Sequence, residues 1–217
     1  MLRPRAGSDP DETLATEVQP FRGLIRYEEQ LPVRQVAYYL CGEIQEPQLY
    51  TELFYTLRNA TETDLILLHI NSPGGDFNTG LQIINNVRAS SARVVTILEA
   101  RAYSMAALIF LSGDELVVHD NCQLMFHQYS GIFSGKGNEQ QAQVTAVNAW
   151  FETVMTRICT PFLSVAEIDR IVKGSDLWLD SEDIRRRLQH KQALEQGRAK
   201  PVARKKARGP AANGTPK

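Results

Sequence analysis

An apolar run that ends in a glycine-rich turn limits, more than any other feature, how this chain can fold. Residues 65–70 are apolar on both faces of a strand, as at the centre of a parallel sheet. Ser72-Pro73-Gly74-Gly75 follows directly, and a helix is expected to begin near Asn78 or Thr79. Such a strand, turn and helix commonly form an anion or oxyanion site, although an isolated Pro-Gly-Gly is more often only a tight turn. The turn lacks the glycine spacing of the common phosphate-binding loops.

Strands and helices alternate along the rest of the chain, which favours an α/β fold with a layered sheet and flanking helices. Strands are expected at residues 36–40, 65–70, 94–98, 116–118, 124–126 and 177–179, the fourth and fifth forming a hairpin around Asp120-Asn121. Helices are expected at residues 47–59, from about 78 onward, and at 102–112, 138–159, 165–172 and 181–188. The helix at 138–159 carries a wide apolar stripe, which indicates that more than one of its faces is covered.

Composition narrows the functional class. A chain of 217 residues with 43% hydrophobic and 23% charged residues is typical of one soluble globular domain. No run reaches the length of a membrane span, and no secretory signal is recognisable. Three widely spaced cysteines and four histidines without ligand spacing indicate reduced thiols and no metal site. We therefore expect a cytoplasmic protein without a metal or other cofactor.

Charge is distributed unevenly along the chain. Residues 191–217 contain eight Lys or Arg and one Glu, whereas the remainder is acidic. We interpret this segment as a basic disordered tail, residues 1–20 as a disordered or extended arm, and residues 21–190 as the folded domain. A basic tail can contact nucleic acid or an acidic partner, but a solvated tail without a specific partner is the favoured interpretation.

Three side chains could together form a nucleophilic site. Ser104 opens an apolar helix, His127 ends a short strand, and Asp176 precedes the last strand. Taken singly, they are more often a helix cap, a strand-end histidine and a loop aspartate. A serine at a buried helix start also suits a nucleophile whose product is an oxyanion, since the helix dipole favours negative charge there.

Three blocks of the sequence together are specific to one family. His69-Ile70-Asn71-Ser72-Pro73-Gly74-Gly75, then Ala102-Tyr103-Ser104-Met105-Ala106, then Met125-Phe126-His127-Gln128, resemble the proteolytic-subunit (ClpP) family of the Clp protease in order and spacing. The resemblance covers about residues 36–188. It implies the ClpP/crotonase-type fold with a protruding handle helix at 138–159.

The resemblance also implies an activity, that of an ATP-dependent-type serine endopeptidase that cleaves unfolded polypeptides inside a ring chamber. Ser104 would be the nucleophile, His127 the general base and acid, and Asp176 the residue that orients His127. Backbone N–H groups of Gly75 and Met105 would form the oxyanion hole. The substrate peptide would contact Gly74 and pair with a strand formed by Gly131, Ile132 and Phe133. The implied partners are further copies of the chain, in stacked seven-membered rings, and a Clp-type AAA+ ATPase.

The chain departs from the family pattern at several points. Tyr103 stands before Ser104 where small residues are usual, and the segment before Val36 does not resemble the usual gating loop. The basic tail is also unusual, so a divergent member, such as a virus-encoded one, would fit. Three other functions remain open: a non-catalytic structural subunit of a mixed ring, a crotonase-type acyl-CoA enzyme, and a Ser/Lys peptidase using Lys136 or Lys173.

Overall fold

A computed structural model describes residues 33–198 of the chain. The strands are β1 (Gln35–Cys41), β2 (Leu65–Ser72), β3 (Arg93–Tyr103), β4 (Glu115–Val118), β5 (Gln123–Phe126) and β6 (Leu177–Asp180). The helices are the 3-10 helix η1 (Pro47–Tyr50), α1 (Thr51–Asn59), α2 (Phe77–Ala89), α3 (Met105–Phe110), α4 (Gly137–Cys159), α5 (Val165–Val172) and α6 (Ser181–Arg198). The arm expected at residues 1–20 and the part of the basic tail beyond residue 198 lie outside the described residues.

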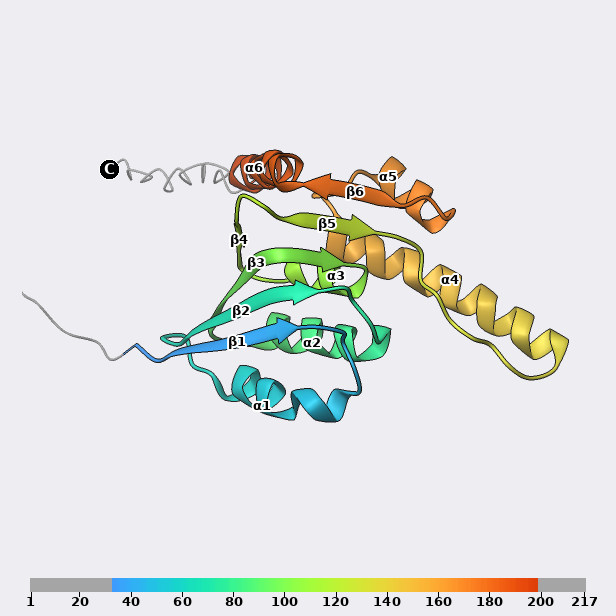
Figure 1. The fold of residues 1–217 in the computed structure, drawn as a ribbon, viewed down its shortest axis with the longest axis horizontal. Helices are drawn as coiled ribbons and strands as arrows, with labels where there is room; N and C mark the ends of the chain where they lie inside the picture. The colour runs from blue at the N-terminus through green and yellow to red at the C-terminus, as the bar shows by residue number, and fades with distance from the viewer. Residues whose placement is uncertain (1–32, 199–217) are drawn as a thin grey trace, which may run out of the picture. The chain divides into compact units, whose positions relative to one another are not determined.

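All six strands form one sheet, which confirms the expected α/β class. The strand order is β1-β2-β3-β5-β6, and β4 pairs with β3 beside this path. Every pairing is parallel except that between β5 and β6, which is antiparallel. Helices α1, α2 and α3 lie along one side of the sheet, and the long helix α4 protrudes beyond it (Figure 1).

The expected hairpin between the fourth and fifth strands is wrong. Both strands pair in parallel with β3, β4 along Val95 to Leu98 and β5 along Arg101 to Tyr103. Because β3 is 11 residues long, it has room for two successive partners on one edge. Asp120 and Asn121 therefore lie in the connection between β4 and β5, two strands that pair with successive parts of β3, and not in a hairpin turn.

Two helix boundaries also differ from expectation. Ala102 and Tyr103 were expected in a helix but belong to β3, where they pair with Leu124 and Met125. Pairing with β5 holds these residues in the sheet, so α3 begins only after Ser104. At the other end of the chain, α6 continues past the expected end at Leu188 to Arg198.

The core lies between the sheet and its helices. Ile66, Leu68 and Ile70 of β2 are almost completely buried, and all of α3 is buried with them. The alternate residues of β2, including Leu67 and His69, are only half-buried. Within residues 33–198 the sheet is therefore fully covered on one face only, in contrast to the two covered faces expected of a central parallel strand. No helix among the described residues is long and apolar enough to span a membrane.

Candidate active site

The glycine-rich turn after β2 lies directly against the residue that precedes α3. Gly74 has φ +95°, and a Cβ atom built there would lie 2.6 Å from the Tyr103 carbonyl oxygen and 2.9 Å from Ser104 Cβ. No larger residue fits without displacing backbone, so glycine is required here by both conformation and space. The turn therefore lies directly against Ser104.

Gly75 completes the turn in a fixed position. Ile44 N donates a hydrogen bond to Gly74 O, and Asp76 N donates to Ile44 O, both at 2.8 Å. The hydrogen bonds of this parallel bridge are made by the Gly74 carbonyl and the Asp76 N–H. The Gly75 N–H takes no part in them. A backbone N–H without a partner in this bridge is the kind of donor that an oxyanion site uses.

Ser104 occupies a strained backbone position between β3 and α3. Its φ of 54° makes it the only non-glycine residue with positive φ among residues 33–198. Its N–H donates to Met125 O at 2.8 Å, which ties the residue to β5. The side chain makes no capping hydrogen bond to α3, so the ordinary interpretation as a helix cap is wrong. Strained φ values of this kind concentrate at functional sites, where they aim a side chain.

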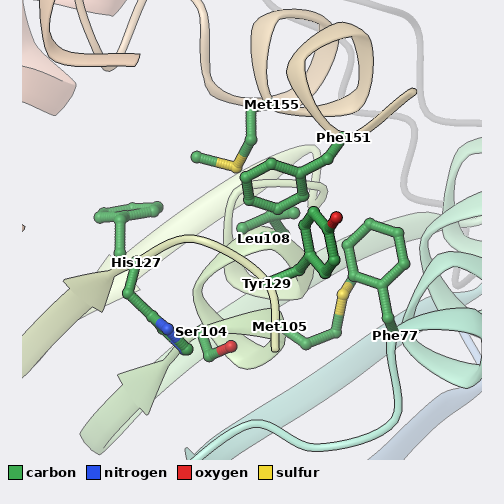
Figure 2. Close-up of a pocket in the computed structure, with 9 residues that line it drawn as sticks. Phe77, Ser104, Met105, Leu108, His127, Tyr129, Phe151 and Met155 are labelled. Atoms are coloured by element: carbon green, nitrogen blue, oxygen red, sulfur yellow. The ribbon is translucent and has the colours of Figure 1, made fainter. Parts of the chain in front are cut away.

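His127 and Ser104 line the same pocket, although no hydrogen bond joins their side chains. His127 directly follows β5, the strand whose Met125 carbonyl binds the Ser104 N–H. Figure 2 shows both side chains at one end of the pocket, with the aromatic rings of Phe77, Tyr129 and Phe151 on its other sides. Tertiary structure thus brings together two residues that lie 23 positions apart in the chain.

Asp176 is placed by the antiparallel pairing of β5 with β6. Phe126 pairs with Leu177, and continuing this register by one residue puts His127 opposite Asp176. Directly opposed residues of antiparallel strands have Cβ atoms about 5 Å apart. Asp176 is exposed, makes no hydrogen bond to His127 and does not line the pocket. The register thus makes it a neighbour of His127 without showing a formed triad.

The first N–H groups of α3 face the same turn. Met105 is the first residue of the helix, so its N–H has no partner within the helix. The Cβ position built on Gly74 lies 3.2 Å from Met105 N. The N–H of Met105 and the glycine-rich turn are therefore neighbours, at the positive end of the α3 dipole.

The segment expected to form a substrate-binding strand is not a strand in the structure. Gly131, Ile132 and Phe133 belong to no β ladder, and Ile132 is 98% exposed. The segment is therefore not a strand among residues 33–198, and its pairing with a substrate peptide stays a prediction.

Sequence analysis missed most of the pocket wall. Phe77 and Tyr129 line the pocket but had not been singled out, although each lies two residues beyond a recognised motif residue, Gly75 and His127. Phe151 and Met155 had been assigned only to the apolar stripe of the long helix. The structure buries both and directs them into the pocket, which no helical periodicity could have indicated.

The two buried cysteines are poor candidates for a nucleophile, and the described residues hold no cluster of metal ligands. Burial raises the pKa of the Cys122 thiol, which donates a hydrogen bond to Leu98 O at 3.0 Å. Burial also raises the pKa of Cys159, to about 12. Both thiols are therefore protonated at neutral pH and are poor nucleophiles. Residues 33–198 contain no cluster of three or more side chains arranged to hold a metal ion.

Comparison with known proteins agrees with this geometry. The family model for Clp protease matches residues 33–184, a range that includes Ser104, His127 and Asp176. The ATP-dependent Clp protease proteolytic subunit of Pleurastrum terricola is 29% identical over 135 residues. That alignment covers 60% of this chain and 64% of the relative, so the chain spans less than two thirds of that protein.

Proposed function

The chain belongs to the Clp protease family, and we propose that it is a serine endopeptidase subunit with Ser104 as its nucleophile. The observation that carries this proposal is the setting of Ser104. A positive-φ residue faces a glycine-rich turn and shares a pocket with His127. Strain at Ser104 is best explained by a need to aim its Oγ at a substrate, because the side chain does not cap α3.

His127 would serve as general base and then as general acid. Ser104 Oγ attacks the scissile carbonyl carbon while His127 takes the hydroxyl proton. When the tetrahedral intermediate collapses, the peptide C–N bond breaks and His127 gives this proton to the leaving amine. Water then releases the acyl group by the same two steps. The missing Ser104–His127 hydrogen bond is compatible with this role, because such bonds often tighten only when substrate is bound.

The developing negative charge would be held by backbone N–H groups. Gly75 and Met105 are our candidates because the bridge to Ile44 leaves the Gly75 N–H free and Met105 begins α3. Two such donors act together with the α3 dipole. Asp176 would orient His127 from across the β5–β6 pair, which requires its carboxylate to turn towards the imidazole.

A non-catalytic ring subunit is the main alternative. It would need neither a strained serine nor a pocket shared by Ser104 and His127, so it leaves the site geometry unexplained. A crotonase-type activity leaves His127 without a role. A Ser/Lys mechanism is also disfavoured, because Lys136 and Lys173 are both largely exposed and neither lines the pocket.

We further propose that the subunits assemble into stacked rings and act on unfolded polypeptides, with a Clp-type AAA+ ATPase as a candidate partner. The exposed apolar residues of α4, including Val144 and Trp150, support an assembly surface. Residues 131–133 would then meet the substrate. Their backbone pairs with no strand of residues 33–198, so its N–H and C=O groups would be open to an extended peptide alongside Gly74.

Covalent labelling tests the proposed nucleophile. A fluorophosphonate probe should label the full-length protein, and Ser104→Ala should abolish labelling and lower peptidase turnover by about a million-fold. Ser90→Ala, at a serine next to α2 and outside the pocket, is the matched control and should label normally. Labelling that persists in Ser104→Ala, in a protein with unchanged thermal unfolding, would reject Ser104 as the nucleophile.

A further inference from the structure

The pocket beside Ser104 is very small. Its cavity volume is about 20 Å³, and its walls include the side chains of Phe77, Met105, Tyr129 and Phe151. A cavity needs roughly 10–15 Å³ of this kind to hold one water molecule. The space is therefore close to that of a single water or methyl group and far below that of a leucine or phenylalanine side chain.

Aromatic contacts hold the pocket wall in place. Phe77 packs edge-on against Trp150 with ring centroids 5.3 Å apart, and it also contacts Phe151 at 5.9 Å. Tyr129 packs against Phe151 at 5.4 Å. Figure 2 shows the rings of Phe77, Tyr129 and Phe151 clustered together beside Met105. Because these rings pack against one another, moving one ring disturbs several contacts.

The walls come from elements far apart in the chain. Phe77 begins α2, Tyr129 lies in the segment after β5, and Phe151 lies in the buried half of α4. Phe151 is only 4% exposed and packs against both Phe77 and Tyr129, so enlarging the pocket on this side requires these buried contacts to break. The side chains of Met105 and Met155 are flexible and can change shape. They line the pocket together with the aromatic rings, so the rings still limit its size.

We propose that this pocket selects substrates with a small residue, Ala, Ser or Gly, at the position whose carbonyl is cleaved. This inference rests on the proposed function, in which that carbonyl lies at Ser104. The side chain of the same residue would then enter the adjoining pocket, because Ser104 and His127 line its mouth. Phe77, Tyr129 and Phe151 are the specificity-determining residues, since their rings occupy the space that a larger side chain would need.

Peptidyl diphenyl phosphonates that differ only in this residue provide the test. Their rates of reaction with the serine can be measured by mass spectrometry even when turnover is slow. The full-length protein should react at least about tenfold faster with the Ala probe than with the Leu or Phe probe, the scale at which apolar pockets discriminate by size. A Leu or Phe probe that reacts as fast as the Ala probe would overturn the proposal.

Enlarging the pocket should reverse the preference. Phe77→Ala removes a half-buried ring and should bring the Leu rate to within about threefold of the Ala rate or above it. Phe54→Ala removes a half-buried ring from α1, outside the pocket, and should leave the ratio unchanged. Phe77→Leu offers a milder change if Phe77→Ala does not fold, and it should shift the ratio in the same direction. An unchanged ratio in the folded Phe77 variant would overturn the assignment of this ring.

The fluorophosphonate and the peptidyl probes together distinguish a failure of the size selection from a failure of the proposed serine mechanism. If a fluorophosphonate labels Ser104 but the peptidyl probes show no preference for Ala, the size selection is wrong and the serine mechanism stands. If neither the fluorophosphonate nor any peptidyl probe labels Ser104, the proposed function is wrong and the size selection falls with it.

Discussion

At the scale of single residues, the site depends on two backbone conformations that side chains rarely adopt. Ser104 has positive φ although it carries a side chain, and Gly74 has positive φ directly beside it. The positive φ of Ser104 costs conformational energy, which the surrounding β3–β5 pairing must offset. The positive φ of Gly74, so close to Ser104, is possible only because glycine has no Cβ atom.

Replacing Gly74 by alanine should therefore damage the site as well as the fold. The new Cβ would lie 2.6 Å from the Tyr103 carbonyl oxygen, so the turn or Ser104 must move. A displacement of about 1 Å at a reacting group typically costs on the order of a hundredfold in rate. We expect at least that loss in the rate of fluorophosphonate labelling of Ser104.

Gly42→Ala is the matched control for this prediction. Gly42 has nearly the same φ, +92°, but nothing lies within 4 Å of an added Cβ. Gly42→Ala should lower the free energy of unfolding by about 1–2 kcal/mol, because alanine disfavours this φ, and should leave the labelling rate unchanged. Equal labelling rates in the two variants would show that the Gly74 turn does not position Ser104.

Asp176 gives a second prediction at this scale. Asp176→Asn keeps the size of the side chain but would stabilise the wrong imidazole tautomer, so turnover should fall by about four orders of magnitude. Asp169→Asn, at an exposed aspartate of α5 that pairs with Lys173, is the control and should retain full activity. Peptide hydrolysis measured across pH 5–9 checks both. A variant that keeps more than a tenth of wild-type turnover would exclude Asp176 as the orienting residue.

At the scale of elements, one ion pair fastens α6 to the start of α5. Arg187 donates two hydrogen bonds to the carboxylate of Glu167, at 2.6 and 3.1 Å, and both side chains are largely buried. Glu167 also accepts the Ser164 N–H in the capping box of α5. The Arg187 guanidinium, with the Ser164 contacts, lowers the pKa of Glu167 to about 2. The pair thus stabilises the ionised carboxylate in the folded state only.

This pair predicts a defined pH dependence of stability. Because the folded-state pKa of Glu167 lies below its ordinary value of 4.5, its contribution is complete above pH 4.5 and is lost as the pH falls towards 2. Arg187→Met should lower the free energy of unfolding by roughly 2 kcal/mol at pH 7 and by much less at pH 3. Denaturant unfolding at both pH values measures the difference.

Arg186→Met is the control for the ion pair. Arg186 lies next in sequence, is 71% exposed, and pairs with Asp183 at the surface. Exposed pairs contribute roughly 0–1 kcal/mol, so this variant should remain close to the wild type at both pH values. A deficit of Arg187→Met that does not shrink at low pH would mean that packing, and not the charge on Glu167, connects α5 and α6.

At the scale of the whole described region, two surfaces that carry apolar residues are only partly covered by the rest of residues 33–198. The first half of α4 protrudes beyond the sheet (Figure 1), and Val144 in it is exposed. Trp150, in the second half, packs against Phe77 but is still 44% exposed. The neighbouring Phe151 is buried. Leu67 and His69 lie on the sheet face that no helix of residues 33–198 fully covers. Obligate interfaces resemble a divided core in this way.

A charge placed on α4 should therefore disrupt assembly without unfolding the subunit. Val144→Glu puts a carboxylate on the protruding half, where the side chain contributes nothing to the buried core. The sedimentation coefficient should shift to that of smaller species. Thr153→Glu places the same charge on an exposed position in the half of α4 that packs against α3 and α5, and it should leave assembly unchanged. A wild-type protein that sediments as a stable and active monomer would refute an obligate assembly.

Local sequence was sufficient to predict many of the strands and helices of this protein and two of its candidate site residues. Strands and helices were predicted from apolar spacing and capping residues, and α5 was predicted to the residue by its Ser164–Glu167 capping box. Ser104 and His127 were predicted from motif blocks, and the structure places both in one pocket. The fold class and the family are confirmed. These features depend on residues a few positions apart, whose geometry the backbone fixes locally.

Only the tertiary structure decided the rest. Whether Ala102 and Tyr103 form strand or helix depends on β5, which pairs with them from more than 20 positions away. The pocket wall formed by Phe77 and Phe151 depends on how α4 packs beside α2, and the place of Asp176 opposite His127 depends on the β5–β6 register. Pairing and packing of distant segments are settled by burial over the whole domain, which no short stretch of sequence encodes.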